Sequence, residues 1–264
     1  MKDRLVNKRI VITGASSGIG QQLAYEVAKA GAIPILVARS HSKLEEIVAH
    51  ITEQFDRTSD YYVCDIGNKQ QWQKTMEKIV QDHKQIHVLL NNAGFGLFQN
   101  VADMDVVDIE KMFSVNVHAL MQSSHFFLTH MLAHGEGHIV NIASQAAKMA
   151  TPKAAVYAAT KHAVLGFTNG LRMEVEAEGI YVTAVNLGPV RTNFFQTADP
   201  GGNYEKALGR LLLDPKDVAE KVIRNLYKTK REINLPLWME LGSRFYRLFP
   251  GLTEKLFKKQ FSKK

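Results

Sequence analysis

The sequence predicts a single-domain α/β fold, built on a doubly wound parallel sheet of seven strands with helices on both faces. Three observations predict it. Short apolar runs alternate along the chain with longer segments of helical period. Most of these runs are continuously apolar, which is typical of parallel strands buried on both faces. The chain also has 264 residues, of which 45% are hydrophobic, and this is enough to bury one large core.

Strands and helices alternate regularly in the first half of the chain. The predicted strands are RIVIT, IPILVA, YYVCD and HVLLN, which begin at residues 9, 33, 61 and 87. Each is followed by a segment of helical period, over residues 18–31, 42–54, 68–83 and 105–134. Because parallel strands need a long crossover connection, a helix after each strand favours a parallel sheet.

The same alternation continues in the second half. The strands HIVNIAS, YVTAVNL and EINLP begin at residues 138, 181 and 232. A helix is predicted over residues 153–178, and a loop with helices is predicted near residues 203–229. No internal repeat or Pro/Gly-rich linker divides the chain. We therefore predict one domain over residues 1–236 and a basic amphipathic C-terminal extension over residues 237–264.

Cysteine usage and apolar runs bear on the compartment. Cys64 is the only cysteine, so an intrachain disulfide is excluded and a reducing compartment is favoured. The apolar run from Ile10 to Ile12 is too short for the core of a signal peptide, and no later stretch is long enough to span a bilayer. We therefore expect a cytoplasmic protein.

The net charge of +7 does not predict nucleic-acid binding. From Arg244 to the end of the chain there are seven Lys or Arg residues against Glu254 alone, while the rest is nearly neutral. Phosphate binding needs a basic face on the folded body, whereas here the basic charge is concentrated at one end. We expect no nucleic-acid partner.

The ten histidines do not predict a metal site. No pair has metal-ligand spacing together with Cys or acidic partners. His118 and His162 each lie beside a candidate site residue, but neighbours in a helix diverge by about 100°. We therefore predict no metal.

A glycine-rich turn follows the first strand and opens the first helix. Its sequence is TGASSGIG, with the spacing G-x-x-x-G-x-G at Gly14, Gly18 and Gly20. Glycine allows a tight turn and a close approach to a pyrophosphate, and the helix start favours negative charge. The alternative is a glycine-rich turn that binds no ligand. Ser16 and Ser17 belong to the same turn and are included in the predicted phosphate site.

The end of the second strand bears on the choice of cofactor. Ala38 stands where an acidic residue would select NAD by binding the adenosine ribose. Arg39 and Ser40 follow, and a guanidinium can pair with a 2′-phosphate. NADP(H) is therefore predicted in preference to NAD(H). The alternative for Arg39 is a solvated side chain at a helix start.

Small and polar residues follow the third and fourth strands. Ligands bind at the carboxyl ends of the strands in open α/β sheets, so these residues are candidates for cofactor contacts. They are Asp65, Ile66, Asn92, Ala93 and Gly94.

Four motifs occur together and in order. TGASSGIG, NNAG, a serine after NIA at position 144, and YAATK thirteen residues later resemble the short-chain dehydrogenase/reductase (SDR) family over about residues 8–235. The resemblance implies a Rossmann-like fold with one seven-stranded sheet and a nicotinamide cofactor. It also implies a homodimer or homotetramer built from the long helices. Residues 1–236 would then be an NAD(P)-binding oxidoreductase domain.

The resemblance also implies roles for individual residues. The family's catalytic residues map onto Asn116, Ser144, Tyr157 and Lys161. Its usual Asn-Pro-Gly after the sixth strand is replaced here by Asn-Leu-Gly with a proline next, so a less rigid start to this loop is expected. The family's cofactor contacts map onto Gly14, Gly18, Ile19, Gly20, Asp65, Asn92, Pro189, Val190 and Thr192, with Tyr157 and Lys161 at the nicotinamide.

Tyr157 and Lys161 are four residues apart on a predicted helix, so both can face one pocket. A free phenol has a pKa near ~10, and a nearby ammonium favours the phenolate and lowers that value. Tyr157 can then protonate a carbonyl oxygen to which Ser144 donates a hydrogen bond. The alternative for the pair alone is a surface pair with a snorkelling lysine. The resemblance implies that Lys161 also binds the nicotinamide ribose and that Asn116 anchors a water connecting Lys161 to solvent.

Three loops beyond the strand ends are apolar, which predicts a mainly hydrophobic substrate. The alternative is that their side chains only close the loops onto the core. The apolar residues are Phe95, Leu97, Phe98, Met149, Phe194 and Phe195.

The C-terminal extension is predicted to form two short amphipathic helices broken at Pro250 and Gly251. Its apolar face can pack on the protein, contact a second subunit, cover the substrate pocket or lie on an anionic membrane. The sequence favours packing or subunit contact over peripheral membrane association.

Two functions follow from these patterns. The first is an NADP(H)-dependent oxidoreductase that interconverts a carbonyl and a secondary alcohol. The second is a nicotinamide-dinucleotide-binding regulatory or interaction protein without turnover. The complete set of catalytic residue types favours the first, because a binding module has no need of an acidified phenol.

Overall fold

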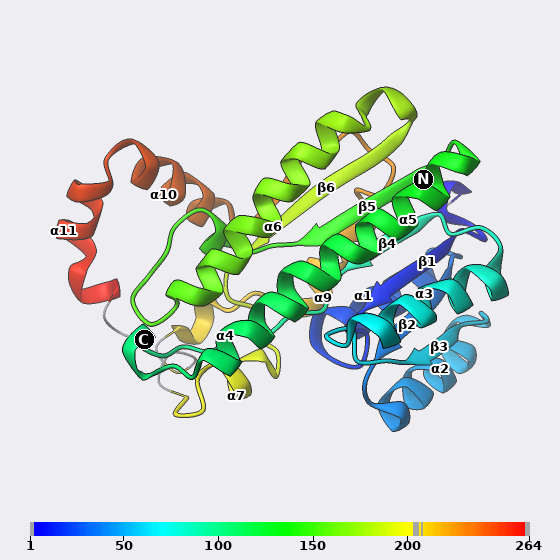
Figure 1. The fold of residues 1–264 in the computed structure, drawn as a ribbon, viewed down its shortest axis with the longest axis horizontal. Coiled ribbons are helices and arrows are strands. Elements are labelled where there is room, and N and C mark those ends of the chain that lie inside the picture. Colours follow the sequence, from blue (N-terminus) through cyan, green and yellow to red (C-terminus); the bar gives the residue numbers. More distant parts are fainter. Residues whose placement is uncertain (1–2, 203–205, 207, 262–264) are drawn as a thin grey trace.

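Seven parallel strands form one sheet at the centre of the protein (Figure 1). The computed structural model describes residues 3–202, 206 and 208–261. The strand order is β3-β2-β1-β4-β5-β6-β7, which confirms the predicted doubly wound parallel sheet of a Rossmann-like fold. The strands are β1 (Arg9–Thr13), β2 (Ile33–Ala38), β3 (Asp60–Val63), β4 (Val88–Asn91), β5 (Gly137–Ile142), β6 (Ile180–Leu187) and β7 (Glu232–Leu235).

The side of the sheet on which successive strands are added changes at β1. The chain proceeds from β1 outward through β2 to β3, and then returns to β4 on the other side of β1. Every pair is parallel, so the carboxyl ends of all strands lie at one edge of the sheet. The crevice outside a reversal of this kind is where open α/β sheets bind ligands.

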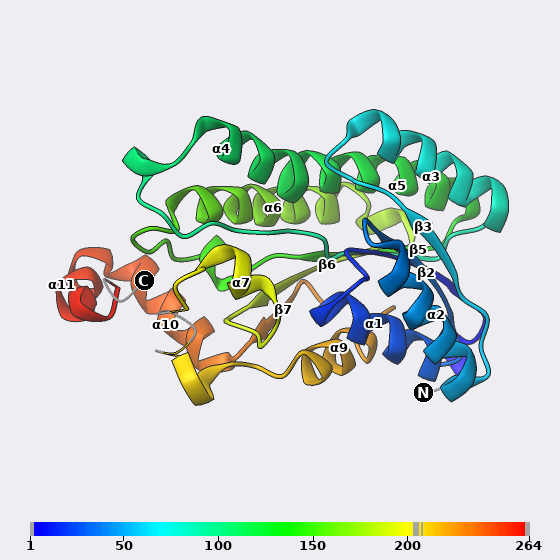
Figure 2. The same cartoon turned by 90° about the horizontal axis from the view of Figure 1, so that it is seen from below.

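Helices cover both faces of the sheet (Figure 2). One layer contains α1, α2 and α9, and the other contains α3, α4, α5 and α6. The helices are α1 (Gly18–Lys29), α2 (His41–Phe55), α3 (Lys69–His83), α4 (Val106–Phe113), α5 (Leu120–His134), α6 (Ala155–Glu174), α7 (Phe194–Ala198), α9 (Pro215–Ile223), α10 (Leu237–Leu248) and α11 (Pro250–Phe261).

The predicted helices agree with these bounds, with two differences. The short helix α7 lies in the segment after Val190 that the sequence predicts as a loop. The segment expected to form one helix over residues 105–134 is α4 and α5 joined by a π-helical segment, Ser114–Ala119. In the region predicted near residues 203–229 the structure contains α9, while residues 203–205 and 207 of that prediction lie outside the described residues.

The core lies on both sides of the sheet because the strand side chains alternate. Ile10 and Ile12 of β1 pack in the layer that contains α1, α2 and α9. Val11, between them, packs in the opposite layer with Trp72 of α3 and Phe127 of α5. Trp72 and Phe127 are the largest fully buried side chains. Because both faces are covered, a central strand such as β1 has apolar side chains on both of its sides, as Ile10, Val11 and Ile12 show.

The starts of the helices differ in a way that positions the site. Asn68, Asp105 and Asp214 cap α3, α4 and α9, and each accepts a hydrogen bond from a backbone N–H of the first turn. Ser17 and Ser40 precede α1 and α2 without any side-chain cap bond. First-turn N–H groups at the cavity end of α1 therefore remain available to an anion.

The last two helices, α10 and α11, project at one end of the molecule (Figures 1 and 2). They confirm the predicted pair of short helices, with the break beside Pro250. Among the described residues, no helix has the length and apolarity needed to cross a bilayer. Residues 262–264 of the predicted extension lie outside the described residues, and the boundary at Pro236 stays a prediction.

Candidate active site

A cavity of about 1230 Å³ opens at the carboxyl edge of the sheet. It brings together most of the site residues that the sequence predicts. Gly20 and Asn116 are not among its lining residues. The predicted residues that line it are Gly14, Ser16, Ser17, Gly18, Ile19, Arg39, Ser40, Asp65, Ile66, Asn92, Ala93, Gly94, Ser144, Tyr157, Lys161, Pro189, Val190 and Thr192.

The turn leaves no room for a side chain at any of its three glycines. Gly14 and Gly18 have φ values of 68° and 55°, in the left-handed region. A Cβ on Gly18 would lie 2.9 Å from the Cγ2 of Thr192. A Cβ on Gly20 would lie 2.1 Å from the carbonyl oxygen of Gly14, so Gly20 allows α1 to pack against the turn. The cradle next to the uncapped start of α1 therefore fits a pyrophosphate.

Thr13 and Asn92 hold this turn in place. The Thr13 hydroxyl accepts hydrogen bonds from the backbone N–H groups of Asn92 and Ala93, at 3.0 and 3.1 Å. The side-chain amide of Asn92 donates to the carbonyl oxygens of Thr13 and Gly14, at 3.0 and 3.2 Å. Both amide hydrogens of Asn92 are thus used within the protein, which makes it a shaping residue of the turn. Thr13 was not among the site residues predicted from the motifs.

Two cations lie where β2 ends and α2 begins. Arg39 and Lys43 are both exposed and both line the cavity. Ala38 ends β2, and the first turn of α2 contains no acidic residue. Lys43 was not predicted, although its position four residues after Arg39 on the start of a helix was a usable signal.

Lys161 is buried at the end of β5. Its Nζ donates a hydrogen bond of 2.8 Å to the carbonyl oxygen of Ile142, the last residue of that strand. The same Nζ lies 5.9 Å from the centre of the Tyr157 ring. Burial lowers the pKa of Lys161 to about 8, so the ammonium form still predominates at neutral pH. The structure therefore places Tyr157 and Lys161 together in the cavity wall, as predicted.

The Tyr157 ring is held by aromatic neighbours. The ring centres of Phe98 and Phe194 lie 6.2 and 5.6 Å away. A Cβ on Gly96 would lie 2.8 Å from the Cδ2 of Tyr157. Gly96, which the sequence analysis missed, lets the loop after β4 lie against the ring. The ring therefore has little freedom to turn away from the cavity.

Ser144 joins the ends of two strands. Its Oγ accepts a hydrogen bond from the backbone N–H of Ala146 at 3.1 Å and donates to the carbonyl oxygen of Leu187 at 3.3 Å. Leu187 is the last residue of β6. The bond to Leu187 is long, and rotation of the hydroxyl can redirect its hydrogen to a ligand oxygen.

Asn116 lies in the π-helical segment between α4 and α5 and is almost fully buried. Its amide donates to the carbonyl oxygen of Phe95 at 2.8 Å and to the Thr160 hydroxyl at 3.1 Å. Its Oδ1 accepts from the backbone N–H of Phe95 at 3.0 Å. Short π-helical segments are often found at functional sites, and this one ties the loop after β4 to α6.

None of the ten histidines lines the cavity. His138 is fully buried in β5, where it accepts from the backbone N–H of Tyr227 at 2.9 Å and pairs with the Thr183 hydroxyl. Burial lowers its pKa to about 3, so it is a neutral structural residue. Across the ranges that the structure describes, no group of three or more His, Cys, Asp or Glu side chains is arranged to hold a metal ion.

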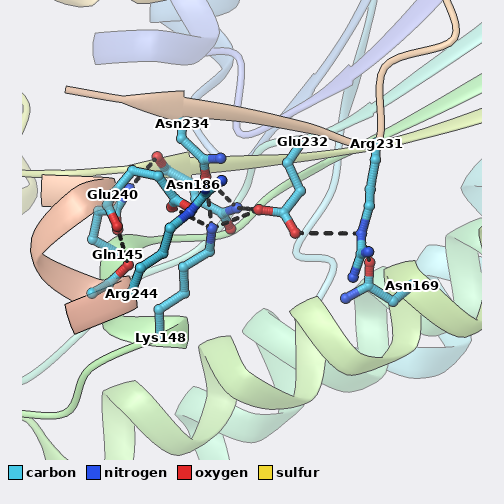
Figure 3. A network of polar contacts seen from close by, with 10 residues as sticks. Gln145, Lys148, Asn169, Asn186, Arg231, Glu232, Asn234, Glu240 and Arg244 are labelled. Carbon is cyan, nitrogen blue, oxygen red and sulfur yellow. Dashed lines mark hydrogen bonds and ion pairs between the residues drawn. The ribbon is translucent and has the colours of Figure 1, made fainter. Parts of the chain in front are cut away.

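A buried ionic network surrounds Lys148, four residues after Ser144 (Figure 3). The Nζ of Lys148 donates to carboxylate oxygens of Glu232 and Glu240, both at 2.5 Å, and to the Oδ1 of Asn234 at 2.9 Å. Arg244 completes it with a bond of 2.9 Å to Glu240. The network thereby joins the loop after β5 to β7 and α10.

The three charged side chains at the centre of this network are poorly exposed to solvent, so each needs a partner of opposite charge. The side chain of Lys148 is 3% exposed, and those of Glu232 and Glu240 are 17% and 9% exposed. Burial favours the neutral acid, but the hydrogen bond and charge of Lys148 hold the pKa of Glu232 below its ordinary value. Without the lysine, two carboxylates would remain in a poorly solvated site.

Residues 8–202 match the family model of short chain dehydrogenases. The chain belongs to the short-chain dehydrogenase family. An uncharacterized oxidoreductase of Staphylococcus saprophyticus is 34% identical over 83% of this chain and 91% of its own length. Dehydrogenase/reductase SDR family member 7B of Danio rerio is 31% identical over 88% of this chain and 78% of its own.

Solved structures of this family share the fold. A short-chain dehydrogenase from Sphingobium yanoikuyae in complex with NADPH superposes with a TM-score of 0.80 at 25% identity, covering 92% of this chain and 95% of that one. A short-chain dehydrogenase/reductase from Burkholderia phymatum in complex with NAD has a TM-score of 0.86 at 23% identity, covering 94% and 95%. The second likeness shows the fold alone.

Family membership establishes the coarse chemistry. The protein is an SDR oxidoreductase that acts on the CH–OH group of donors with NAD(P), and the glycine cradle and cavity of this chain fit such a cofactor. The homodimer or homotetramer and the cytoplasmic location stay predictions from the sequence.

The buried position of Lys161 predicts an unusual titration. Its ammonium should be lost as the pH rises through about 8, well below the ordinary lysine pKa of about 10.4. NMR titration of lysine Cε resonances measures this directly, and Lys161→Met assigns the signal. A Lys161 signal that titrates together with the exposed lysines would contradict the assignment of a desolvated ammonium.

The buried network predicts a large effect of Lys148 on stability. Lys148→Met should lower the free energy of unfolding by about 3–5 kcal/mol, because it removes the buried cation and leaves Glu232 and Glu240 only the more exposed Arg231 and Arg244 as ion partners. Lys8→Met is the matched control, since Lys8 contacts Glu136 at 2.5 Å but the pair is more exposed, and its effect should be at most about 1 kcal/mol. Urea unfolding measures both.

A second variant tests the cause of that loss. Lys148→Met combined with Glu232→Gln and Glu240→Gln should recover part of the stability, because the two carboxylate charges that lost their buried partner are removed. An equal loss in Lys148→Met and Lys8→Met would show that the buried network has no special weight.

Proposed function

We propose that the protein is an NADP(H)-dependent oxidoreductase that interconverts a carbonyl and a secondary alcohol on a mainly apolar substrate. One observation carries the proposal: a single cavity is lined by Ser144, Tyr157 and Lys161 in one part and by Arg39 and Lys43 in another. The strands β2 and β5 behind these groups are three strand spacings, about 14 Å, apart. The two groups can therefore contact opposite ends of one extended dinucleotide.

The residues of this chain supply the proton and its stabilisation. A bound reduced nicotinamide supplies the hydride. Ser144 donates a hydrogen bond to the carbonyl oxygen, and Tyr157 donates its phenolic proton as negative charge grows there. The buried ammonium of Lys161 favours the phenolate that remains. In the reverse direction, the phenolate of Tyr157 accepts the proton of the alcohol.

Asn116 and Lys161 both lie close to Gly94. The Oδ1 of Asn116 and the Nζ of Lys161 lie 3.1 and 3.5 Å from the same point, the position of a Cβ on Gly94. Both side chains therefore approach the loop after β4 at one place. We propose that Asn116 fixes this loop and helps to resupply protons to Lys161.

The cations at the adenosine end support a preference for NADP(H). A 2′-phosphate adds negative charge that Arg39 can bind bidentately and that Lys43 can attract. The cavity has no acidic residue at the end of β2 that would bind a free 2′-hydroxyl. The protein from Sphingobium yanoikuyae is in complex with NADPH, while the one from Burkholderia phymatum is in complex with NAD. The family alone thus leaves the choice to local residues.

Substitution of Arg39 or Lys43 should change kcat/KM for NADPH more than kcat/KM for NADH. Arg39→Ser and Lys43→Ser should each lower kcat/KM for NADPH by about tenfold to a hundredfold, because each removes a charged contact to phosphate. The value for NADH should change by less than about threefold. Steady-state kinetics with both cofactors measures this. The matched control is Lys228→Ser, an exposed cation that precedes β7 at the opposite edge of the sheet. A parallel loss with NADPH and NADH would overturn the assignment.

Apolar side chains from three segments line the substrate part of the cavity. They come from the loop after β4, the loop after β5 and α7, and Met239 of α10 joins them. Leu97, which the sequence analysis included, is not among the lining residues. The apolar lining residues are Phe95, Phe98, Met149, Phe194, Phe195 and Met239. Burial of apolar surface against them favours a hydrophobic carbonyl or alcohol.

The catalytic role of Tyr157 is tested with a substrate panel. A series of ketones from small and polar to large and apolar is assayed with NADPH on the wild type and on Tyr157→Phe. The apolar ketones should be preferred by at least about tenfold in kcat/KM. Tyr157→Phe should lower kcat by at least about a hundredfold, since it removes the proton donor.

The control for this experiment is cofactor binding. Tyr157→Phe should bind NADPH with nearly unchanged affinity, as measured by fluorescence titration. Equal turnover across the panel would remove the apolar substrate. Cofactor binding without any turnover that depends on Tyr157 would favour the regulatory protein instead.

A further inference from the structure

The helices α10 and α11 expose a row of large apolar side chains, here called the C-terminal apolar face. Their exposed fractions range from 43% to 73%. One interpretation of the sequence, that these side chains pack on the protein itself, is therefore wrong for this face. It consists of Leu237, Trp238, Leu241, Phe245, Leu248, Phe249, Leu252 and Leu256.

The face points outward because the other side of α10 is fixed to the protein. Successive residues advance by about 100°, so Leu237, Leu241 and Leu248 fall on one arc of the helix. Ser243, about 200° from Leu241, is buried, and Glu240 is held by Lys148. Both views show α10 and α11 at one end of the molecule, beyond the sheet (Figures 1 and 2). The arc is thus free to contact another surface.

Positive charge accompanies this face. The sequence from Arg244 onward has seven Lys or Arg residues and one Glu, a net charge of +6. Arg247 and Lys255 are exposed within the described part. In a two-fold contact between copies of this chain, each face would meet an identical positive surface, which is electrostatically unfavourable. An anionic lipid surface offers the complementary charge and accepts apolar side chains at the same time.

We propose that the C-terminal apolar face docks on an anionic membrane. Its aromatic and leucine side chains enter the boundary between headgroups and acyl chains, and the flanking cations contact the headgroups. Met239 lies between Trp238 and Glu240 and lines the cavity. The docked face therefore adjoins the wall of the cavity that receives the substrate. This inference does not depend on the proposed cofactor preference or catalytic roles.

The two tryptophans make docking measurable on the full chain. Trp238 is 57% exposed on the face, while Trp72 is fully buried and remote from solvent. Vesicles of phosphatidylcholine mixed with phosphatidylglycerol should shift the Trp238 emission to the blue, and brominated lipid should quench it. Flotation of the protein with these vesicles should decline as salt rises, and vesicles of phosphatidylcholine alone should bind at least about tenfold more weakly.

Two pairs of variants separate the contributions of apolar contact and charge. Leu241→Glu with Leu248→Glu, and Arg247→Gln with Lys255→Gln, should each weaken vesicle binding by at least about tenfold. The controls make equal changes of charge elsewhere: Val106→Glu with Met173→Glu on exposed apolar positions, and Lys74→Gln with Lys228→Gln on exposed cations. The controls should bind within about twofold of the wild type. Thermal unfolding in the absence of lipid should be unchanged in all four.

Several outcomes would overturn the proposal. One is a lack of flotation with anionic vesicles at low salt; another is the same loss of binding in the control variants as in the face variants. A third is self-association without lipid that shields Trp238 from acrylamide and is abolished by Leu241→Glu with Leu248→Glu. That result would assign the face to a second copy of the chain.

Discussion

The hydrogen bond from the Lys161 ammonium to the carbonyl oxygen of Ile142 is the interaction on which the active site depends. A buried cation needs a strong acceptor, and the last carbonyl of β5 supplies it. This bond fixes α6 against the carboxyl edge of the sheet. Tyr157, one turn earlier on α6, is thereby placed at the same edge. The burial that lowers the pKa of Lys161 would also strengthen the proposed stabilisation of a Tyr157 phenolate, because charges interact more strongly in a poorly solvated site.

Most of the fold could be predicted because its signals are local. A strand buried on both faces is mostly apolar, and β1, β2 and β4 each contain a continuous apolar run, IVI, IPILVA and VLL. The π-helical segment around Asn116 could not be predicted. Its extra residue per turn depends on how α4 and α5 meet the loop after β4, and that contact joins residues 21 positions apart.

The site was predictable to the extent that its residues stand in compact motifs. Lys148 does not belong to such a motif, because its partners Glu232 and Glu240 are 84 and 92 positions away in the sequence. A lysine among Ala and Met residues was the only local signal of burial. Thr13 and Gly96 were missed for a related reason. Their importance comes from the backbone or ring that lies against them, which no pattern within the sequence displays.

The polarity of α10 is the reverse of that of a surface helix in a globular protein. Its inner side carries Glu240 in a satisfied ionic network, and its outer side carries leucines and aromatic residues. The inner arrangement is stable because Lys148 and Arg244 neutralise the carboxylates. The outer arrangement leaves apolar surface in water until something non-aqueous covers it. Lys148 directly follows the turn that begins at Ser144, so the ions that hold α10 also hold the loop of Ser144. A surface that binds the outer side of α10 therefore acts on a helix whose inner side is bonded to the loop of Ser144, at the proposed substrate end of the cavity.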